Sequence, residues 1–221
     1  MERGMKSVAV VLSGCGVFDG SEIHESVLTM LSLDRLGVKT SFLAPDEPQL
    51  HVINHISGEE IGEKRNVLQE SARISRGKIK PLSQANADEF DALIIPGGFG
   101  VAKNLCDFAV KEVDCEINKD LLSLVRTMHK QHKPMGFMCI APVMLPKLLN
   151  KPVKLTIGHE PNTVAQIEKM GGIHVACKVD EIVVDLENKI VTTPAYMLAE
   201  SISQAEEGID KLVKKVLEMT E

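Results

Sequence analysis

Short aliphatic runs alternate with helical apolar patterns from one end of this chain to the other. Ser7–Leu12 is a continuous run rich in Val, which is typical of a strand that is covered on both faces. Ala92–Ile95, Pro134–Met138 and Ile190–Thr193 repeat this pattern, with helical spacing between them. The alternation predicts an α/β fold with a mostly parallel sheet, whose sites lie beyond the carboxyl ends of the strands.

The chain of 221 residues contains no linker, repeat or low-complexity tract, so we expect one domain spanning 1–221. The pattern is least clear over residues 47–80, where a short extended piece and a Gly-interrupted turn precede a helix over Asn66–Ile74. We expect this stretch to form an insertion beside the sheet. A short strand is expected later in the chain at Val175–Cys177.

Two helices near the ends of the chain have a spacing that predicts which face they bury. The last helix repeats apolar residues every three or four positions between Ile202 and Val216. The first helix has Ser21 as its N-cap and ends at Gly37. Its apolar stripe consists of Ile23, Val27, Met30 and Leu31. We expect both stripes to face the core.

The composition excludes several classes of protein. Asp and Glu outnumber Lys and Arg by 31 to 25, and the net charge of −6 argues against a general nucleic-acid binder. Aromatic residues make up 3% of the chain, with no Trp, which argues against base-stacking platforms. No run approaches the ~18 apolar residues of a membrane span. We therefore expect neither nucleic acid nor a membrane as a partner.

The five cysteines, at positions 15, 106, 115, 139 and 177, form no C-x-x-C pair. An odd number without metal-ligand spacing argues against a disulfide framework or a zinc site, and reduced thiols are typical of the cytosol. Leu12–Cys15 resembles a lipoprotein cleavage box, but the apolar stretch before it is shorter than the ~7–15 residues of a signal sequence. We expect a cytoplasmic protein with no metal ion and no cofactor.

Cys139 is the residue with the clearest indication of a chemical role. The strand over residues 134–138 runs directly into a helix over Ala141–Leu149, so Cys139 occupies a strand-to-helix elbow. A nucleophile at such an elbow is exposed at the sheet edge, and the amides of the next helix point towards it. Because a helix N-terminus stabilises negative charge, we expect a thiolate near neutral pH. The alternative is a buried, inert cysteine.

A second indication is the glycine-rich loop Pro96–Gly100 (PGGFG), which follows a core strand. Glycines at this position let the backbone approach a ligand and present N–H groups to an oxyanion. The loop matches neither G-x-G-x-x-G nor G-x-x-x-x-G-K-[ST], so nucleotide binding is not indicated. A tight turn without a ligand is the alternative.

Four segments resemble the class I glutamine amidotransferase-like superfamily, in the PfpI-type branch that includes deglycases and glyoxalases. These segments are residues 7–13, 91–100, 134–148 and 182–195. The likeness spans nearly the whole chain and implies a flavodoxin-like three-layer sandwich. Ser13–Glu25 and Gly136–Leu145 are especially similar to bacterial glyoxalases that are also described as isoprenoid-biosynthesis proteins.

The resemblance implies roles for individual residues at the sheet edge. Cys139 matches the nucleophile of the superfamily. Gly97 and Gly98 match its backbone oxyanion donors, together with the amide of Ile140.

The resemblance also places a Glu in the first turns of the first helix, within reach of the thiol. Counting back from Gly37 selects Glu25, with Glu22 as the alternative. A carboxyl beside a thiolate can share its proton and act as general acid and base. The alternative is that these carboxylates have no catalytic role and only stabilise the N-terminus of the helix through its dipole. His174 lies where this branch carries a catalytic-site His, and a strand-end His without a catalytic role is the alternative.

Two departures from the superfamily narrow the function. Its glutaminases use a late His-x-Glu pair, whereas His159 and Glu160 are adjacent in this chain. Its peptidases carry His directly after the nucleophile, where this chain has Ile140. Both departures argue against those activities.

The sequence therefore predicts a cofactor-independent glyoxalase that acts on glyoxal or methylglyoxal, with an apparent deglycase activity open. The resemblance suggests a link to isoprenoid biosynthesis, and superfamily members imply a homodimer. The mostly glycine-lined mouth indicates a small dicarbonyl substrate of two or three carbons. The alternatives are a non-catalytic regulatory or redox-sensing protein on the same scaffold and an ammonia-generating amidotransferase subunit.

Overall fold

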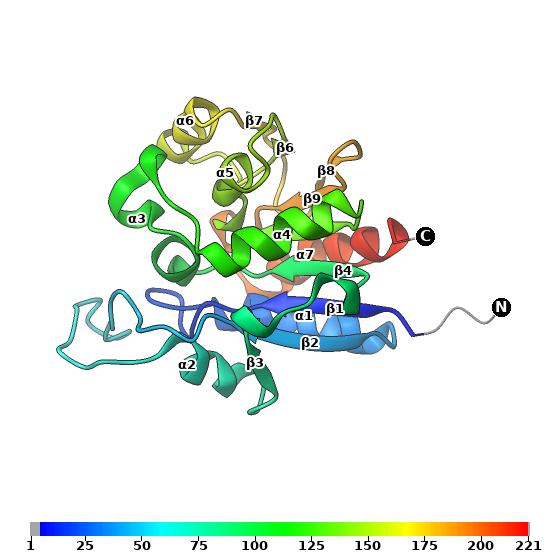
Figure 1. The fold of residues 1–221 in the computed structure, drawn as a ribbon. Helices are drawn as coiled ribbons and strands as arrows, with labels where there is room; N and C mark the ends of the chain where they lie inside the picture. Colours follow the sequence, from blue (N-terminus) through cyan, green and yellow to red (C-terminus); the bar gives the residue numbers. More distant parts are fainter. Residues whose placement is uncertain (1–4, 221) are drawn as a thin grey trace.

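The computed structural model describes residues 5–220, and its central feature is a seven-stranded sheet (Figure 1). The strands are β1 (Ser7–Val11), β2 (Lys39–Ala44), β3 (Ile79–Pro81), β4 (Ala92–Ile95), β5 (Met135–Met138), β8 (Val183–Asp185) and β9 (Ile190–Thr193). Their order in the sheet is β3-β2-β1-β4-β5-β9-β8. All neighbouring pairs are parallel except β8 and β9, so the prediction of an α/β fold with a mostly parallel sheet is confirmed.

Helices cover both faces of this sheet. α4 (Lys119–Lys130) and α5 (Leu145–Leu149) pack on one face, and α1 (Ile23–Arg35) and α7 (Ile202–Glu218) pack on the other. Figure 1 shows α4 in front of the sheet and α1 and α7 behind it, which gives the three layers that were expected. α2 (Val67–Ile74) packs beside β2 and β3. Within residues 5–220, none of the helices is both long and apolar enough to cross a bilayer.

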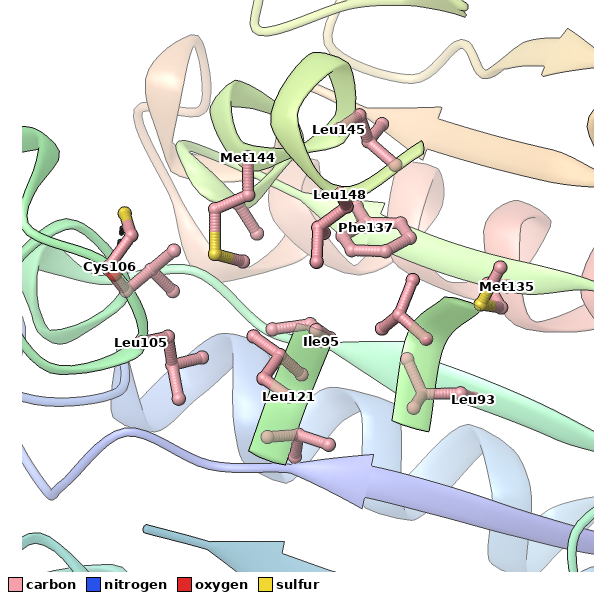
Figure 2. Close-up of a cluster of buried hydrophobic side chains, with 14 of the residues drawn as sticks. Leu93, Ile95, Leu105, Cys106, Leu121, Met135, Phe137, Met144, Leu145 and Leu148 are labelled. Carbon is pink, nitrogen blue, oxygen red and sulfur yellow. Dashed lines mark hydrogen bonds between the residues drawn. The ribbon is translucent and has the colours of Figure 1, made fainter. Parts of the chain in front are cut away.

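The aliphatic runs form strands because both of their faces are buried. In β1, Val8 and Val10 belong to the apolar cluster under α1 and α7, whereas Ala9 and Val11 belong to the cluster under α4 and α5. Figure 2 shows the second cluster, in which Phe137 of β5 lies among side chains from α4 and α5. Each large apolar side chain buried in this way contributes about 1.5–3 kcal/mol, so the two clusters fix the strand register.

The first helix buries a different face from the one expected. Ile23, Val27 and Leu31 are 42%, 48% and 39% exposed, and Met30 is half-buried. The inward face instead carries mostly polar residues. These are Glu25, Ser26, Thr29 and Ser32, with Leu33 beside them. The prediction that the apolar stripe of this helix faces the core is therefore wrong.

Only the last part of the expected insertion belongs to the main sheet, where β3 forms one edge. The irregular part, residues 47–66, lies against the loop that follows β1. The Asp19 carboxylate accepts a hydrogen bond from the Ile53 N–H at 2.7 Å, and His55 Nε2 accepts one from the Phe18 N–H at 3.2 Å. These bonds hold residues 47–66 over that loop.

A smaller two-stranded sheet lies between β5 and β8 in the chain. It pairs β6 (Lys154–Leu155) with β7 (Ile173–His174), and α6 (Pro161–Lys169) connects them. The prediction of a strand at Val175–Cys177 is therefore wrong, because β7 ends at His174. Two short helical segments were not foreseen. They are a π-helix over Val101–Leu105 and the helix α3 over Phe108–Lys111.

Candidate active site

The carboxyl ends of three neighbouring strands bring together the segments that the sequence singled out. The chain runs outwards from β1 to β2 and β3, and then returns to β4 on the other side of β1. Such a reversal of strand order opens a crevice between the two loops at that point. Residues 13–22 follow β1, residues 96–100 follow β4, and Cys139 follows β5 directly.

Cys139 stands at the end of β5 in a conformation that most residues avoid. Its φ of +59° lies in the left-handed region, which costs roughly 1–2 kcal/mol for a residue with a side chain. Its N–H donates to the Thr193 carbonyl at 3.1 Å, which ties the elbow to β9. The backbone N–H groups of Gly98 and Ile140 lie near the sulfur and oppose the rise in the pKa of the thiol. The chain then continues in a 3₁₀ turn over Ala141–Met144 rather than directly in an α-helix.

Glu25, in the first turn of α1, lies next to the Cys139 sulfur. The side chain is fully buried, and its carboxyl lies beside the Cys139 thiol. Its Oε2 accepts from the Gly97 N–H at 2.8 Å, and its Oε1 accepts from the Tyr196 N–H at 3.1 Å. The carboxylate of Glu22 instead accepts from the Glu25 N–H at 2.7 Å. Glu22 is thus the N-cap of α1, in place of the expected Ser21, and Glu25 is the carboxyl that reaches the thiol.

Burial opposes the ionisation of both acidic groups, and the Glu25 carboxylate further opposes that of the Cys139 thiol. Burial raises the pKa of Glu25 to about 7, and the negative charge of Glu22 adds to the shift. Burial and the nearby Glu25 carboxylate raise the pKa of the Cys139 thiol well above its usual range, although the amides of Gly98 and Ile140 oppose this. The expectation of a thiolate near neutral pH is therefore wrong. Since two adjacent acids in a buried site do not both ionise readily, they share a proton.

Gly97 has a different role from the expected one. Because its N–H donates to Glu25, it is not directed at an oxyanion, and the donors that remain beside the sulfur are Gly98 and Ile140. A Cβ at Gly97 would lie 2.8 Å from the Cys139 sulfur and 2.7 Å from Glu25 Oε2. Only a glycine fits between these two side chains.

His174 lies in β7 of the small sheet, where it pairs with Leu155. Burial lowers the pKa of its imidazole, which is the usual effect on a basic group. None of the contacts made by Cys139 or Glu25 involves His174, so the structure does not bring this candidate into the site. Nor do residues 5–220 contain a group of three or more His, Cys, Asp or Glu side chains placed to hold a metal ion.

A pocket of about 390 Å³ opens beside Cys139. Most of the residues that line it are apolar, and the others carry a hydroxyl, a carboxyl or, at Cys139, the thiol. The lining comprises Val17, Glu22, Gly98, Phe99, Ala102, Phe108, Ala109, Cys139, Ile140, Glu160, Thr163, Tyr196 and Met197. The expectation of a mostly glycine-lined mouth is wrong, because one glycine, Gly98, contributes to this lining.

Comparison with known proteins decides the family. The model of the DJ-1/PfpI family matches residues 8–196. The chain belongs to the DJ-1/PfpI family. An isoprenoid biosynthesis protein with amidotransferase-like domain from Ehrlichia chaffeensis has a known crystal structure, and its sequence is 41% identical to this chain. The two structures align with a TM-score of 0.89 over 96% of this chain and 99% of the Ehrlichia chain. The PfpI-type membership and the amidotransferase-like fold predicted from the sequence are therefore confirmed.

The curated relatives correct the expected localisation and add animal proteins to those that this chain resembles. The human glutamine amidotransferase-like class 1 domain-containing protein 3 is 47% identical over 99% of this chain and 85% of its own length. It and the ES1 proteins of rat and zebrafish are named mitochondrial, so the prediction of a cytoplasmic protein is wrong. These relatives are also animal proteins, whereas the sequence pointed to bacterial glyoxalases.

A more distant member of the same fold is glyoxalase III from Candida albicans. It aligns with a TM-score of 0.63 over 98% of each chain, at 14% identity. At that identity, the likeness shows the shared fold alone.

Two residues of this DJ-1/PfpI site were not foreseen from the sequence. Tyr196 positions Glu25 through its N–H and lines the pocket, and its hydroxyl lies 2.8 Å from His24 Nδ1. Glu160 lines the pocket from the start of α6. Tyr196 follows β9, which pairs with β5, so the rule that sites lie beyond the carboxyl ends of strands points to it. No comparable rule points to Glu160.

Proposed function

We propose that this DJ-1/PfpI protein is a cofactor-independent glyoxalase that converts glyoxal to glycolate and methylglyoxal to lactate. The observation that carries the proposal is the close approach of the Cys139 thiol and the Glu25 carboxyl beside an open pocket. A nucleophile in contact with its own general base is the arrangement that covalent catalysis needs. The amides of Gly98 and Ile140 supply donors for a developing oxyanion.

In the first step, the sulfur of Cys139 adds to the aldehyde carbon of the substrate. The Glu25 carboxylate accepts the thiol proton as the S–C bond forms, and the carbonyl electron pair moves to oxygen. The amides of Gly98 and Ile140 stabilise this alkoxide. Glu25 then returns the proton to the alkoxide, which gives a neutral hemithioacetal and restores the carboxylate.

In the second step, the Glu25 carboxylate removes the proton from the carbon bonded to sulfur, and an enediolate forms with the neighbouring carbonyl. After a proton shifts between the two adjacent oxygens, Glu25 protonates the second carbon. The product is a thioester with a hydroxyl on that carbon. Water adds to the thioester carbonyl and expels the Cys139 sulfur, which recovers its proton. The sum is substrate plus water giving a 2-hydroxy acid.

The names of two related proteins agree with parts of this proposal. The Candida protein of the same fold is named glyoxalase III, and the Ehrlichia protein is named an isoprenoid biosynthesis protein. A link of this chain to isoprenoid biosynthesis is part of the proposal. An apparent deglycase activity on glycated amines would use the same thiol and carboxyl.

The test measures loss of methylglyoxal and formation of lactate by the wild type and by paired variants. We expect Cys139→Ala and Glu25→Gln each to lose activity by a factor of about 10²–10⁴, whereas Cys177→Ala retains it. Glu22→Gln keeps the helix cap, since an amide oxygen can accept the same N–H, and it retains activity within a few-fold. Equal rates for all five proteins would refute the proposal.

The raised pKa of Cys139 weighs against the redox-sensing alternative. Oxidant sensors depend on a thiolate, which peroxide attacks far faster than a thiol. Burial and the Glu25 carboxylate keep this sulfur protonated. Rapid formation of a sulfenate at Cys139 in dilute peroxide, without turnover of any aldehyde, would favour the sensor instead.

We also propose that the protein forms a homodimer through the outward face of α1. Ile23, Val27 and Leu31 form an exposed apolar stripe on that face, and an exposed apolar patch is a common mark of a protein–protein contact. A stripe without charge is complementary to its own copy across a two-fold axis.

A further inference from the structure

We propose that the pocket beside Cys139 selects α-oxoaldehydes that carry an uncharged apolar substituent and discriminates against those that carry an anionic group. This inference rests on the proposed function, because it names the substrate class of the same site. It differs from the expectation of a two- or three-carbon substrate.

The size of the pocket is the first observation. A volume of about 390 Å³ falls within the range of pockets that enclose whole drug-sized ligands. Glyoxal and methylglyoxal would leave most of this volume unfilled. A substrate with a larger substituent can bury that substituent while its aldehyde carbon stays beside the sulfur.

The side chains that line the pocket determine which substituent of the substrate binds most tightly. Val17 comes from the loop after β1, Phe99 from the loop after β4, Phe108 from α3 and Met197 from the segment after β9. These side chains surround the space next to the sulfur with apolar atoms. Each substituent methylene that they cover is expected to raise kcat/KM about fourfold, until the pocket is filled.

The charges around the pocket are negative. Glu22 and Glu160 belong to the lining, and Glu25 lies behind Cys139. Hydrogen bonds from the hydroxyl and N–H of Thr163 and from the Asn162 N–H lower the pKa of Glu160, so it is ionised near neutral pH. An anionic substituent would therefore lie among carboxylates.

No Lys, Arg or His belongs to the lining formed by the described residues. One cation lies next to a lining residue, because Lys103 Nζ is 5.9 Å from the centre of the Phe99 ring. This ammonium donates to the Phe18 carbonyl at 2.8 Å and is not itself part of the lining. Among the described residues, the lining thus offers no cationic side chain to pair with a carboxylate or phosphate.

Alkylation of Cys139 tests the pocket without relying on turnover. The wild type is treated with iodoacetamide, N-benzyl-iodoacetamide or iodoacetate, and modification of the Cys139 peptide is followed by mass spectrometry. Rates are divided by those of a small free thiol, and Cys177 in the same sample is an internal control. At Cys139 we expect the benzyl reagent to be at least about tenfold faster, and iodoacetate at least about tenfold slower, than iodoacetamide. Ratios equal to those at Cys177 would overturn the inference.

A matched pair of variants tests whether the carboxylate of Glu160 causes the slow reaction of Cys139 with iodoacetate. Glu160→Gln removes a carboxylate from the lining, whereas Glu168→Gln removes one from the exposed side of the same helix. We expect the rejection of iodoacetate to weaken severalfold in Glu160→Gln and to be unchanged in Glu168→Gln. Equal effects of the two variants would contradict the inference.

Turnover of phenylglyoxal and of 4-carboxyphenylglyoxal separates the two proposals. We expect phenylglyoxal to have a higher kcat/KM than methylglyoxal, and the carboxylated compound a lower one. Selective alkylation without turnover of any dicarbonyl would refute the glyoxalase proposal and leave the selectivity of the pocket standing. Turnover with equal kcat/KM for all three compounds would refute the selectivity and leave the glyoxalase standing.

Discussion

α1 and α7 pack against each other on the same face of the sheet, but they bury opposite kinds of residue. α7 follows the usual rule for an amphipathic helix, with an apolar inward face. That face includes Ala205, Ile209, Leu212, Val213 and Val216. α1 buries a carboxyl and three hydroxyl groups, and its apolar stripe faces outwards.

The reversal follows from the position of α1 at the active edge of the sheet. Contact between Glu25 and Cys139 fixes the rotation of the helix, so Thr29 and Ser32, four and seven positions later, must also face inwards. Their hydroxyls have partners, since Thr29 Oγ1 lies 3.8 Å from the Met138 sulfur and Ser32 Oγ donates to Asp210 at 2.8 Å. An apolar stripe therefore predicts the buried face of a helix only where the same helix does not also have to hold a catalytic side chain in the site.

The largest expected effect is at Glu25, and it concerns activity and its dependence on pH. The carboxylate is the basic form, so kcat/KM of the wild type is expected to rise as pH increases through about 7. Glu25→Gln should lower kcat/KM by about 10²–10⁴ and remove this rise. One carboxylate oxygen becomes an NH₂ that faces a backbone N–H, so the amide cannot replace both acceptors. A variant that keeps the wild-type pH profile would show that another group is the base.

The inward face of α7 should affect stability instead of chemistry. Leu212 is fully buried, and its side chain lies over Gly136 of β5. Leu212→Ala is expected to lower the free energy of unfolding by about 2–5 kcal/mol, through lost burial and a cavity. Urea denaturation measures this change, with Lys214→Ala on the outer face as the control. If Leu212→Ala lowers kcat per folded molecule as strongly as Glu25→Gln, the contrast between the two helices is wrong.

The buried carboxyl of α1 should also make stability depend on pH. Its pKa rises from 4.5 to about 7 on folding, so the folded state binds the proton more tightly than the unfolded state. The stabilisation is present below about pH 4.5 and is lost as pH rises through about 7. A shift of this size corresponds to roughly 3 kcal/mol. Urea titrations between pH 4.5 and 8 should show this loss in the wild type and not in Glu25→Gln, and parallel curves would contradict it.

Much of the fold and part of the site could be predicted from the sequence, because strands buried on both faces are aliphatic and the elbow at Cys139 is local. The roles of Gly97 and Tyr196 could not be predicted. They depend on which N–H points at Glu25, and that follows from the packing of α1. The pKa direction at Cys139 was missed because burial and a neighbouring carboxylate outweigh two amides. His174 was misplaced because the small sheet carries it away from the edge.

The smallest effect on stability is expected at the outward face of α1, with a matched contrast in α7. Val27 is 48% exposed and Val213 is fully buried, so the same change to Asp tests both faces. Val27→Asp should change the free energy of unfolding of the monomer by no more than about 0.5 kcal/mol, whereas Val213→Asp should prevent stable folding. Dilute protein must be used, because dimerisation adds a concentration-dependent stabilisation.

Val27→Asp also tests the proposed homodimer, because the new carboxylate would be buried without a partner in the centre of an apolar interface. Light scattering after size-exclusion chromatography should show a dimer for the wild type and a monomer for Val27→Asp, with Val27→Ala remaining a dimer at high concentration. A Val27→Asp protein that remains dimeric would exclude this face as the interface. A Val27→Asp protein that fails to fold would show that the outward stripe of α1 contributes to the core, and the contrast with α7 would then not hold.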